Sequence, residues 1–347
     1  MISFGKILFF PILFLLSLIY RILFFLDRSF KKKRTLPSSI TISVGNFSVG
    51  GTGKTPFTLH LAKLLHSNFP NIPIVILSRG YGSSGKGTRR VTENSSATEI
   101  GDEPLLLKKN LPFAEVYVGS NRYDSYLQFR SENKIPTDQK VFTLLDDGFQ
   151  HHALNRDLDL VLLDCTKLSK MEFVLPLGLL RESYSSVSRA NFLIASKFSE
   201  EWEDLLSKWI QKYRPSQTLK FKFSPQKLVP LSSEASEVSV KDLLGKSVFS
   251  FAGLGNPDSF YSSLKDQNPS ELKTKSYPDH YSYTKEDLVH ISEKSSDQDY
   301  IICTEKDGVK IASLIEMDKN FSKWFYLRLE TVLENESELV NSVRSFI

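Results

Sequence analysis

The sequence predicts an α/β protein with a mostly parallel sheet domain, a second, smaller α/β domain and an apolar N-terminal helix. Three observations support this fold class. Short, nearly continuous apolar runs alternate with helical patterns, which is typical of strands buried on both faces of a parallel sheet. A glycine-rich loop ending in Gly-Lys-Thr joins one such run to a helical pattern. The chain also opens with a long stretch of almost wholly apolar residues.

The apolar stretch Ile7–Leu26 has the composition of a membrane helix. As a helix it would rise about 30 Å, roughly one hydrocarbon thickness. Residues 1–34 hold seven Lys or Arg against one Asp, and most of these cations follow the apolar stretch, which predicts a body on the cytoplasmic side of a membrane. A cleaved signal peptide fits poorly because no small-residue cleavage site follows. The sequence leaves open whether the helix spans the bilayer or lies in one leaflet.

Length and composition indicate an ordinary globular protein behind this anchor. With 347 residues, 41% hydrophobic and 24% charged, the chain is long enough for two domains. The formal charge of +4 comes from the N-terminal segment, so the rest of the chain is slightly acidic. This argues against a nucleic-acid-binding protein. Cys165 and Cys303 each lie in a strand-like run, as expected for buried free thiols in a reducing compartment.

The glycine-rich loop has the layout of a phosphate-binding P-loop, with an apolar run at 40–44 before it and a helical pattern at 57–65 after it. Its glycines let backbone N–H groups surround an anion, Lys54 would reach the β- and γ-phosphates, and the Thr55 hydroxyl would bind Mg²⁺. Ser48 departs from the usual pattern, which has glycine there, and a plain glycine turn before a helix is the alternative. The predicted nucleotide-binding residues are Ser48, Val49, Gly50, Gly51, Thr52, Gly53, Lys54 and Thr55.

The remaining elements follow in order along the chain. Strands of the first domain are predicted at 40–44, 74–77, 115–118, 141–145, 158–163 and 192–195, with an amphipathic helix at 201–213. Leu219–Ser224 and Trp324–Val332 alternate apolar and polar residues, which predicts two half-exposed strands that pair as a short ribbon. Between them we expect a surface connection at 230–240, strands at 247–252 and 300–304, and helices around 257–264 and from 285.

These patterns predict the domain organisation. We expect an N-terminal membrane anchor helix with its basic flank at 1–34, a P-loop NTPase-like domain at 35–218, and a smaller α/β domain at 219–333. The linker strands of the smaller domain lie at 219–225 and 323–332, and the closing helix 334–347 is expected to return to the first domain.

Two apolar runs end in Asp, the residue that helps to hold Mg²⁺ in P-loop proteins. One ends in Asp146-Asp147 and continues into Gly-Phe-Gln-His-His, which gathers polar groups at the carboxyl end of a strand, where α/β sheets bind ligands. The other ends in Asp164, for which a helix cap or turn is an equally good interpretation.

Several further polar residues have both a structural and a functional interpretation. Arg79, Arg89 and Arg90 follow a strand and would grip phosphate or belong to a solvated loop. Asp102 begins a helical pattern, and on sequence alone an N-cap is the favoured role. His280 is either a general base or an exposed loop residue. The Lys and Asp of Thr304–Gly308 stand in the wrong order for a guanine-selecting motif.

Together these motifs resemble the tetraacyldisaccharide 4′-kinase family, the lipid A kinases of Gram-negative bacteria. The resemblance covers nearly the whole chain, and that family also has a hydroxyl residue at the position of Ser48. The motifs that carry it are Val44–Pro56, Leu77-Ser-Arg-Gly-Tyr-Gly82, Gly101-Asp-Glu-Pro104, Leu145-Asp-Asp-Gly-Phe-Gln-His151, Arg156-Asp157, Leu175-Pro-Leu-Gly-Leu-Leu-Arg-Glu182, Pro278-Asp-His-Tyr281 and Thr304-Glu-Lys-Asp307.

The resemblance implies ATP-dependent phosphorylation of the 4′-hydroxyl of an acylated glucosamine disaccharide 1-phosphate, giving lipid IVA, in a cleft between two domains. It implies ATP and Mg²⁺ as cofactors, the lipid and the cytoplasmic leaflet of the inner membrane as partners, and no obligate protein partner. Asp102 is implied as the base, or the carboxylate that supports it, paired with His280. The resemblance also assigns Asp146 and Asp147 to metal and phosphate, makes Glu182 a candidate for the metal shell, and has Arg122, His151 and Arg181 line the site.

Two departures from the family and two rival functions accompany this hypothesis. Ser183 replaces the family's Pro after Glu182, and Ser120 removes a basic neighbour of Arg122. A membrane-tethered P-loop ATPase switch is the strongest rival, although such proteins often have Lys where this chain has Val49. A nucleotide-binding scaffold with a decayed site is the other, and the intact candidate residues argue against it.

Overall fold

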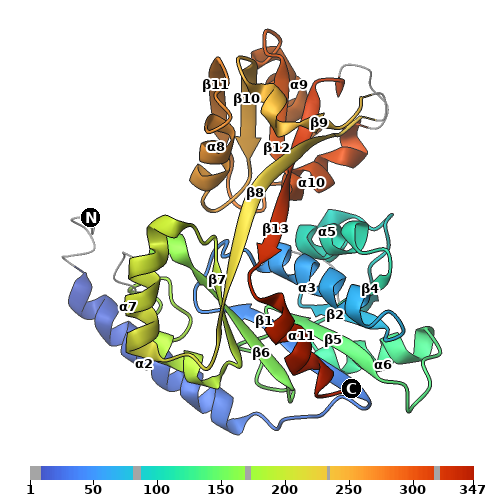
Figure 1. The fold of residues 1–347 in the computed structure, drawn as a ribbon, viewed down its shortest axis with the longest axis vertical. Coiled ribbons are helices and arrows are strands. Elements are labelled where there is room, and N and C mark those ends of the chain that lie inside the picture. The colour runs from blue at the N-terminus through green and yellow to red at the C-terminus, as the bar shows by residue number, and fades with distance from the viewer. Residues whose placement is uncertain (1–8, 81–86, 169–172, 233–234, 316–320) are drawn as a thin grey trace.

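The computed structural model describes residues 9–80, 87–168, 173–232, 235–315 and 321–347. Its strands form one sheet through the molecule, in the order β11-β10-β12-β13-β8-β7-β6-β1-β5-β2-β4-β3. Figure 1 shows a larger lower part and a smaller upper part, joined by the long strands β8 and β13.

The lower part of the sheet is parallel except at its edge. Each of its parallel strands begins and ends within two residues of a predicted run, because strands buried on both faces are apolar throughout. Arg89–Arg90 (β3), which pairs antiparallel with β4, was not predicted, since two arginines form no strand pattern. The parallel strands are β1 (Ser39–Asn46), β2 (Ile74–Ser78), β4 (Ala114–Val118), β5 (Val141–Asp146), β6 (Leu158–Asp164) and β7 (Phe192–Ser196).

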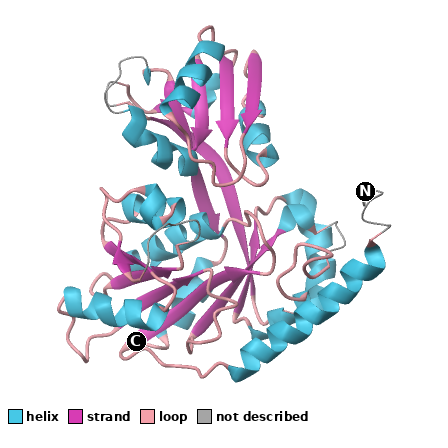
Figure 2. Cartoon of the chain, turned by 180° about the vertical axis from the view of Figure 1, so that it is seen from behind, coloured by secondary structure: helices cyan, strands magenta, loops and turns pink. Residues whose placement is uncertain are grey.

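Helices cover both faces of this part of the sheet (Figure 2). On β2, Ile74 and Ile76 face the core beneath α3, α5 and α11, whereas Val75 and Leu77 face the core beneath α6. The alternation of a strand therefore decides which helices each side chain meets. The helices are α3 (Lys54–Asn68), α4 (Ala97–Ile100), α5 (Asp102–Asn110), α6 (Arg122–Glu132), α7 (Glu203–Tyr213) and α11 (Glu336–Arg344), with 3₁₀ turns at Cys165–Lys167, Tyr184–Arg189 and Glu200–Trp202.

Strands β8 (Thr218–Pro230) and β13 (Trp324–Leu333) pair antiparallel, from Phe221 opposite Leu333 to Pro230 opposite Phe325. The ribbon is longer than the predicted Leu219–Ser224, because pairing with β13 keeps β8 extended beyond the end of the alternating pattern. The predicted surface connection at 230–240 is wrong in part, since β9 (Val238–Ser239) pairs with β8 and a 3₁₀ turn follows at Val240–Leu243.

The upper part of the sheet contains the parallel strands β10 (Ser247–Ala252), β11 (Glu271–Ser276) and β12 (Tyr300–Thr304). Strand β11 was not predicted, because Glu-Leu-Lys-Thr-Lys-Ser on an exposed edge has few apolar residues. The helices here are α8 (Asp258–Lys265), α9 (Lys285–Lys294) and α10 (Glu305–Ile315). The chain then returns to the lower part, where Leu339 of α11 shares the core of α3.

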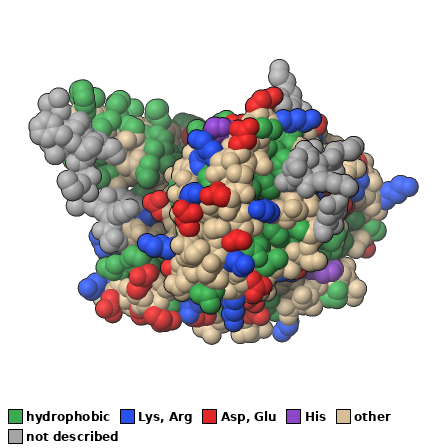
Figure 3. Space-filling view, turned by 90° about the horizontal axis from the view of Figure 1, so that it is seen from above, with side chains coloured by type: hydrophobic (Ala, Val, Ile, Leu, Met, Phe, Trp, Pro, Cys, Tyr) green, Lys and Arg blue, Asp and Glu red, His purple; other side chains and the backbone are tan. Residues whose placement is uncertain are grey.

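Helix α2 (Phe10–Phe30) lies along one edge of the lower part (Figure 1). It has a mean hydropathy of 2.0, so by length and composition it is able to cross a membrane. It ends four residues beyond the predicted Leu26. Most of its large apolar side chains are exposed, and hydrophobic side chains gather over this helix at one edge of Figure 3. Among its described residues, the buried one is polar Ser17.

Candidate active site

The glycine-rich loop joins β1 to α3, as the sequence predicts. Gly53, with φ of 87°, precedes the first residue of α3, and a Cβ at this position would lie 2.7 Å from atoms of Phe223 and Ser196. Only glycine fits this combination of backbone angle and space. Residues 49–55 line a cleft, whereas the buried side chain of Ser48 is not among the lining residues.

The shape of the loop is held by hydrogen bonds to its carbonyl groups. Asn46 at the end of β1 donates from Nδ2 to the Ser48 carbonyl at 2.7 Å and to the Thr52 hydroxyl at 2.8 Å. From the end of β7, the Ser196 hydroxyl donates to the Thr52 carbonyl at 2.7 Å, and Lys197 Nζ to the Gly51 carbonyl at 2.8 Å. These bonds engage the carbonyls of Ser48, Gly51 and Thr52 and leave the N–H groups of residues 50–53 available for an anion.

Sequence reasoning did not select Ser196 and Lys197 as functional residues. Their position is the feature that could have identified them. Ser196 is the last residue of β7 and Lys197 follows it, at the same carboxyl end of the parallel strands as the P-loop. Lys197 Nζ also donates to buried Asp164 at 2.9 Å, and Asp164 caps the turn that follows it by accepting from the Thr166 N–H. Of the two roles left open for Asp164, the structure shows the cap.

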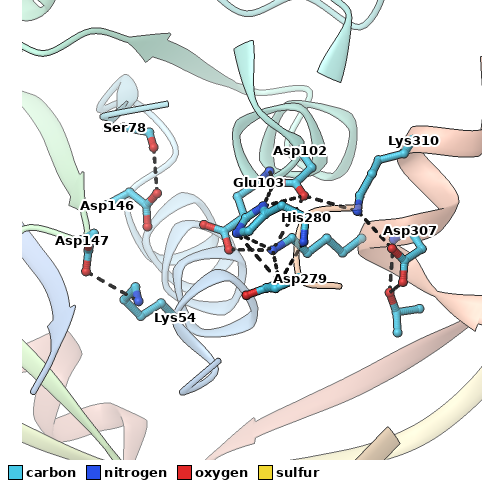
Figure 4. A network of polar contacts seen from close by, with 12 residues as sticks. Lys54, Ser78, Asp102, Glu103, Asp146, Asp147, Asp279, His280, Asp307 and Lys310 are labelled. Carbon is cyan, nitrogen blue, oxygen red and sulfur yellow. Dashed lines mark hydrogen bonds and ion pairs between the residues drawn. The ribbon is translucent and has the colours of Figure 1, made fainter. Parts of the chain in front are cut away.

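Asp146 and Asp147 end β5 beside the P-loop (Figure 4). Asp146 accepts a hydrogen bond from the Ser78 hydroxyl at 2.9 Å. Asp147 lies 3.5 Å from Lys54 Nζ and accepts from Arg181 Nη1 at 2.7 Å. Asp147 has φ of 51°, an uncommon conformation for a non-glycine residue.

The two carboxylates differ in acidity. Burial, followed by the charges of Glu103 and Asp147, raises the pKa of Asp146. Burial also acts to raise the pKa of Asp147, but Lys54 and Arg181 outweigh it and the net shift is downward. Asp147 is therefore ionised at neutral pH. Around Asp146, the nearby positive charge does not offset burial and the neighbouring acidic groups.

This acidic pair fits a magnesium ion shared with a bound phosphate. The buried Oδ1 atoms of Asp146 and Asp147 have no hydrogen-bond partner among the described residues. Within the same residues, no three His, Cys, Asp or Glu side chains gather into a complete metal site. Mg²⁺ is usually bound by one or two carboxylates, water and substrate phosphates, which is compatible with both observations.

Asp102 faces this acidic pair across the cleft, and the predicted N-cap is wrong. Gly101 holds the cap position of α5, and Asp102 is the first helical residue. Its carboxylate, 6% exposed, lies 3.0 and 3.2 Å from Nδ1 of His280, which comes from the upper part of the molecule. Lys306 and Lys310 of α10 lie 3.7 and 3.6 Å from Oδ2 of Asp102. Figure 4 shows this cluster opposite Lys54 and Asp147.

The contacts make Asp102 and His280 a charged pair. Burial opposes ionisation of Asp102, but the hydrogen bond from His280 and the charge of Lys306 lower its pKa to about 2. The same hydrogen bond raises the pKa of His280. His280 has φ of 57°, so its position depends on a strained backbone, as often occurs at functional sites.

Lys306 and Lys310 were not selected from the sequence. Lys306 Nζ lies 3.3 Å from Glu103 of the lower part and 3.4 Å from Nε2 of His280 in the upper part, so it contacts both parts of the molecule. A detectable signal was the spacing of four residues, which puts both lysines on one face of a helix. Asp307 has a structural role, because it is fully buried and accepts from the Gly253 N–H at 2.9 Å.

The other predicted site residues have varied surroundings. Arg122 is buried and donates to the Asp146 carbonyl at 2.7 Å. His151 lines the cleft, and burial together with nearby cations such as Arg122 lowers its pKa to about 3, so it is neutral. Arg181 contacts Asp147. Glu182 is engaged by Arg189, at 2.8 and 3.1 Å, and by Gln150 Nε2 at 3.1 Å.

The three arginines after β2 were predicted either to grip phosphate or to belong to a solvated loop, and they differ in their surroundings. Arg79 lines the cleft. Arg90 pairs with Glu115 through two contacts of 2.9 Å, and Arg89 donates to the Glu99 carbonyl. Only the first of the three therefore contributes directly to the cleft wall.

The cleft has a volume of about 1640 Å³ and is lined by residues of both the lower and the upper part. The P-loop and the acidic pair form one wall, and Asp102, His280 and Lys306 form another. At a further end the cleft reaches α2 and its basic flank, through Tyr20, Phe24, Lys31, Lys32 and Arg34. One continuous space therefore connects a phosphate-binding loop, a carboxylate–imidazole pair and the apolar helix.

Comparison with known proteins identifies the family. Residues 7–347 match the family model described as tetraacyldisaccharide-1-P 4′-kinase. A tetraacyldisaccharide 4′-kinase of Syntrophobacter fumaroxidans is 34% identical over 313 residues, which cover 87% of this chain and 79% of that protein. One of Flavobacterium psychrophilum is 31% identical and covers 93% of this chain and 92% of its own.

A solved structure agrees with these matches. The crystal structure of LpxK from Aquifex aeolicus, described as an "apo" form in complex with ATP, superimposes with a TM-score of 0.71 at 31% sequence identity. The alignment covers 98% of both chains, so the predicted α/β fold class is confirmed. The match over nearly the whole sequence, together with the sequence relatives, shows that this chain belongs to the tetraacyldisaccharide 4′-kinase family.

Proposed function

We propose that the protein transfers the γ-phosphoryl group of ATP to the 4′-hydroxyl of an acylated glucosamine disaccharide 1-phosphate, giving lipid IVA for lipid A biosynthesis. The observation that carries this proposal is the Asp102–His280 pair facing the P-loop across one cleft. A P-loop by itself explains nucleotide binding. A proton acceptor opposite it is what a hydroxyl nucleophile requires.

The donor half of the site would be formed by the P-loop. Its N–H groups and Lys54 would hold the phosphates of ATP, and Arg181 would neutralise charge on them. Thr55, Asp146 and Asp147 would hold Mg²⁺, which when bound neutralises phosphate charge and aligns the phosphoryl group. Because both oxygens of Glu182 are engaged by Arg189, a metal role for Glu182 would require that ion pair to open.

The acceptor half would be formed by Asp102 and His280. As the sugar oxygen forms its bond to the γ-phosphorus, the bond from phosphorus to the bridging oxygen breaks and ADP leaves with that electron pair. The pair accepts the hydroxyl proton when His280 is neutral, and ionised Asp102 then stabilises the imidazolium that forms. The lysines beside Asp102 keep its carboxylate ionised and ready to support a proton on the imidazole.

The lipid would reach the cleft from α2. Tyr20 and Phe24 of this helix line the cleft, and the cations Lys31, Lys32 and Arg34 follow them. An apolar helix beside a basic flank suits the cytoplasmic leaflet of the inner membrane, and the cations suit the 1-phosphate of the substrate. In this arrangement the acyl chains remain in the bilayer while the sugar enters the cleft.

A direct assay tests the proposal. Purified full-length protein is incubated with ATP, Mg²⁺ and disaccharide 1-phosphate lipid, and mass spectrometry is used to detect a lipid heavier by one phosphoryl group. Lys54→Ala serves as the control without donor binding. ATP hydrolysis that leaves the lipid unmodified would contradict the proposal and favour the ATPase switch.

A further inference from the structure

Ser17 attaches the apolar helix α2 to the body of the protein. It is 7% exposed, and its hydroxyl donates to the Val174 carbonyl at 3.0 Å while accepting from the Leu177 N–H at 3.2 Å. The other serine of the helix, Ser29, is exposed and bonds back to the Phe25 carbonyl at 2.9 Å. The Ser17 hydroxyl therefore joins α2 to loop 173–181, whereas the Ser29 hydroxyl bonds only within the helix.

Loop 173–181 is compact. The Leu175 N–H donates to the Leu180 carbonyl at 2.8 Å, and the Leu180 N–H donates to the Phe173 carbonyl at 3.0 Å. At Gly178 an added Cβ would lie 2.1 Å from the Phe173 carbonyl oxygen, so the backbone folds back on itself too closely for any side chain. These bonds and this close approach make the loop one compact unit between the Ser17 contacts and residues 179–181.

The far end of the loop is bonded to the phosphate-binding loop. The Val49 N–H donates to the Leu179 carbonyl at 2.9 Å, and the Arg181 N–H donates to the Phe47 carbonyl at 2.7 Å. The side chain of Arg181 then reaches Asp147 at 2.7 Å. A chain of hydrogen bonds therefore runs from the apolar helix, through one compact loop, to both the P-loop and an acidic residue beside it.

We propose that Ser17 and loop 173–181 position the P-loop, so that the seating of α2 on the body sets the affinity for nucleotide. This inference rests on the proposed function in treating α2 as the membrane-contacting element. When the Ser17 bonds are made, the loop backbone of residues 47–49 is held in place before nucleotide binds. When they are lost, part of the binding free energy is used to order that backbone. Linkage then requires that bound nucleotide also favours the seated position of α2.

The test uses full-length protein in detergent micelles and a fluorescent ATP analogue with Mg²⁺. Ser17→Ala leaves the Leu177 N–H without its acceptor, so its affinity for the analogue is expected to fall roughly five- to tenfold, the change typical of losing a buried hydrogen bond. Ser29→Ala is the matched control and is expected to stay within about twofold of the parent. In the lipid assay, the KM for ATP should rise while the KM for the lipid is unchanged.

Two further measurements separate positioning from loss of folding. Hydrogen exchange of the amides at 47–53 should be faster in Ser17→Ala, with the amides of β6 unchanged. Ser17→Cys keeps nearly the same volume with weaker hydrogen bonds, so it should lie between the parent and Ser17→Ala, and it replaces Ser17→Ala if that variant does not fold. Equal affinity in all variants, or an equal loss in Ser29→Ala, would overturn the inference. Nucleotide binding is measured without the lipid, so this failure is distinct from failure of the lipid kinase reaction.

Discussion

Replacing Asp102 by Asn is expected to abolish the proton-accepting half of the site while leaving the nucleotide-binding half intact. The substitution keeps the shape of the side chain and removes its charge. It also weakens the 3.0 Å contact with His280 Nδ1 and leaves Lys306 and Lys310 beside a neutral group. The P-loop, on the opposite wall of the cleft, loses no contact.

The magnitude follows from the surroundings of the carboxylate. Despite burial, His280 and the two lysines lower the pKa of Asp102 from 3.8 to about 2, which corresponds to roughly 2 to 3 kcal/mol of net favourable interaction with the ionised form. We therefore expect Asp102→Asn to lower the free energy of unfolding near pH 6 by roughly 2 to 3 kcal/mol. Loss of a proton acceptor is expected to lower kcat by roughly 10²- to 10⁴-fold.

The pH dependence tests the assignment of this free energy to the charge. Because the pKa is lower in the folded state, the stabilisation is present above pH 3.8 and is lost as the pH falls towards 2. The difference in unfolding free energy between the parent and Asp102→Asn should be constant between about pH 5 and pH 6, where His280 stays protonated, and shrink below about pH 4.

The assays are chemical denaturation, lipid phosphorylation and binding of a fluorescent ATP analogue, with Asp138→Asn at an exposed carboxylate as the control. Binding of the analogue should be unchanged in both variants. A kcat within about threefold of the parent, or an equal loss of nucleotide affinity and turnover, would refute the assignment of Asp102 to the acceptor half.

Three further predictions follow from the site. The hydrogen bond that His280 donates to Asp102 raises the pKa of His280 above 6.5, so its stabilisation is complete below pH 6.5 and is lost as the pH rises through the folded value. Denaturation of the parent and His280→Gln between about pH 6 and 9 should therefore converge, and a gap that widens would contradict the ion pair. Lys197→Met removes the bond to the Gly51 carbonyl, so steady-state kinetics should show a KM for ATP about tenfold higher, with Lys197→Arg less affected; equal values would remove Lys197 from this role. Deleting residues 1–30 should release the protein from liposomes in flotation, and tight residual attachment would show that other surfaces dominate membrane binding.

The parallel strands and the P-loop were predictable because their signals are local. A strand buried on both faces must be apolar along its length, and a loop that wraps an anion needs glycines at fixed spacing. These requirements are met within a dozen residues, so they are visible without tertiary contacts. Strand β11 was not predicted from its sequence, because it lies exposed at the edge of the sheet and is not required to be apolar.

Asp102 shows why sequence patterns misassign a residue that lines the cleft. Its position at the start of a helical pattern predicts a cap, yet Gly101 has that role and the carboxylate faces a histidine that is 178 positions away. Only the resemblance to the kinase family joined the two residues in advance. Lys306 was quoted only as part of the Thr304–Asp307 motif and Lys310 was not selected, because both reach Asp102 only through the packing of α10 against α5.

The sequence by itself determined the apolar helix, most of the parallel strands, the phosphate-binding loop and the kinase family. Each of these depends on residues that are near one another in the chain or on motifs in a fixed order. The tertiary structure decided which side chains meet: His280 with Asp102, Lys197 with the carbonyls of the P-loop, and Ser17 with loop 173–181. Those pairings arise from the folding of a single sheet that brings distant segments together, and no local pattern encodes a distance between them.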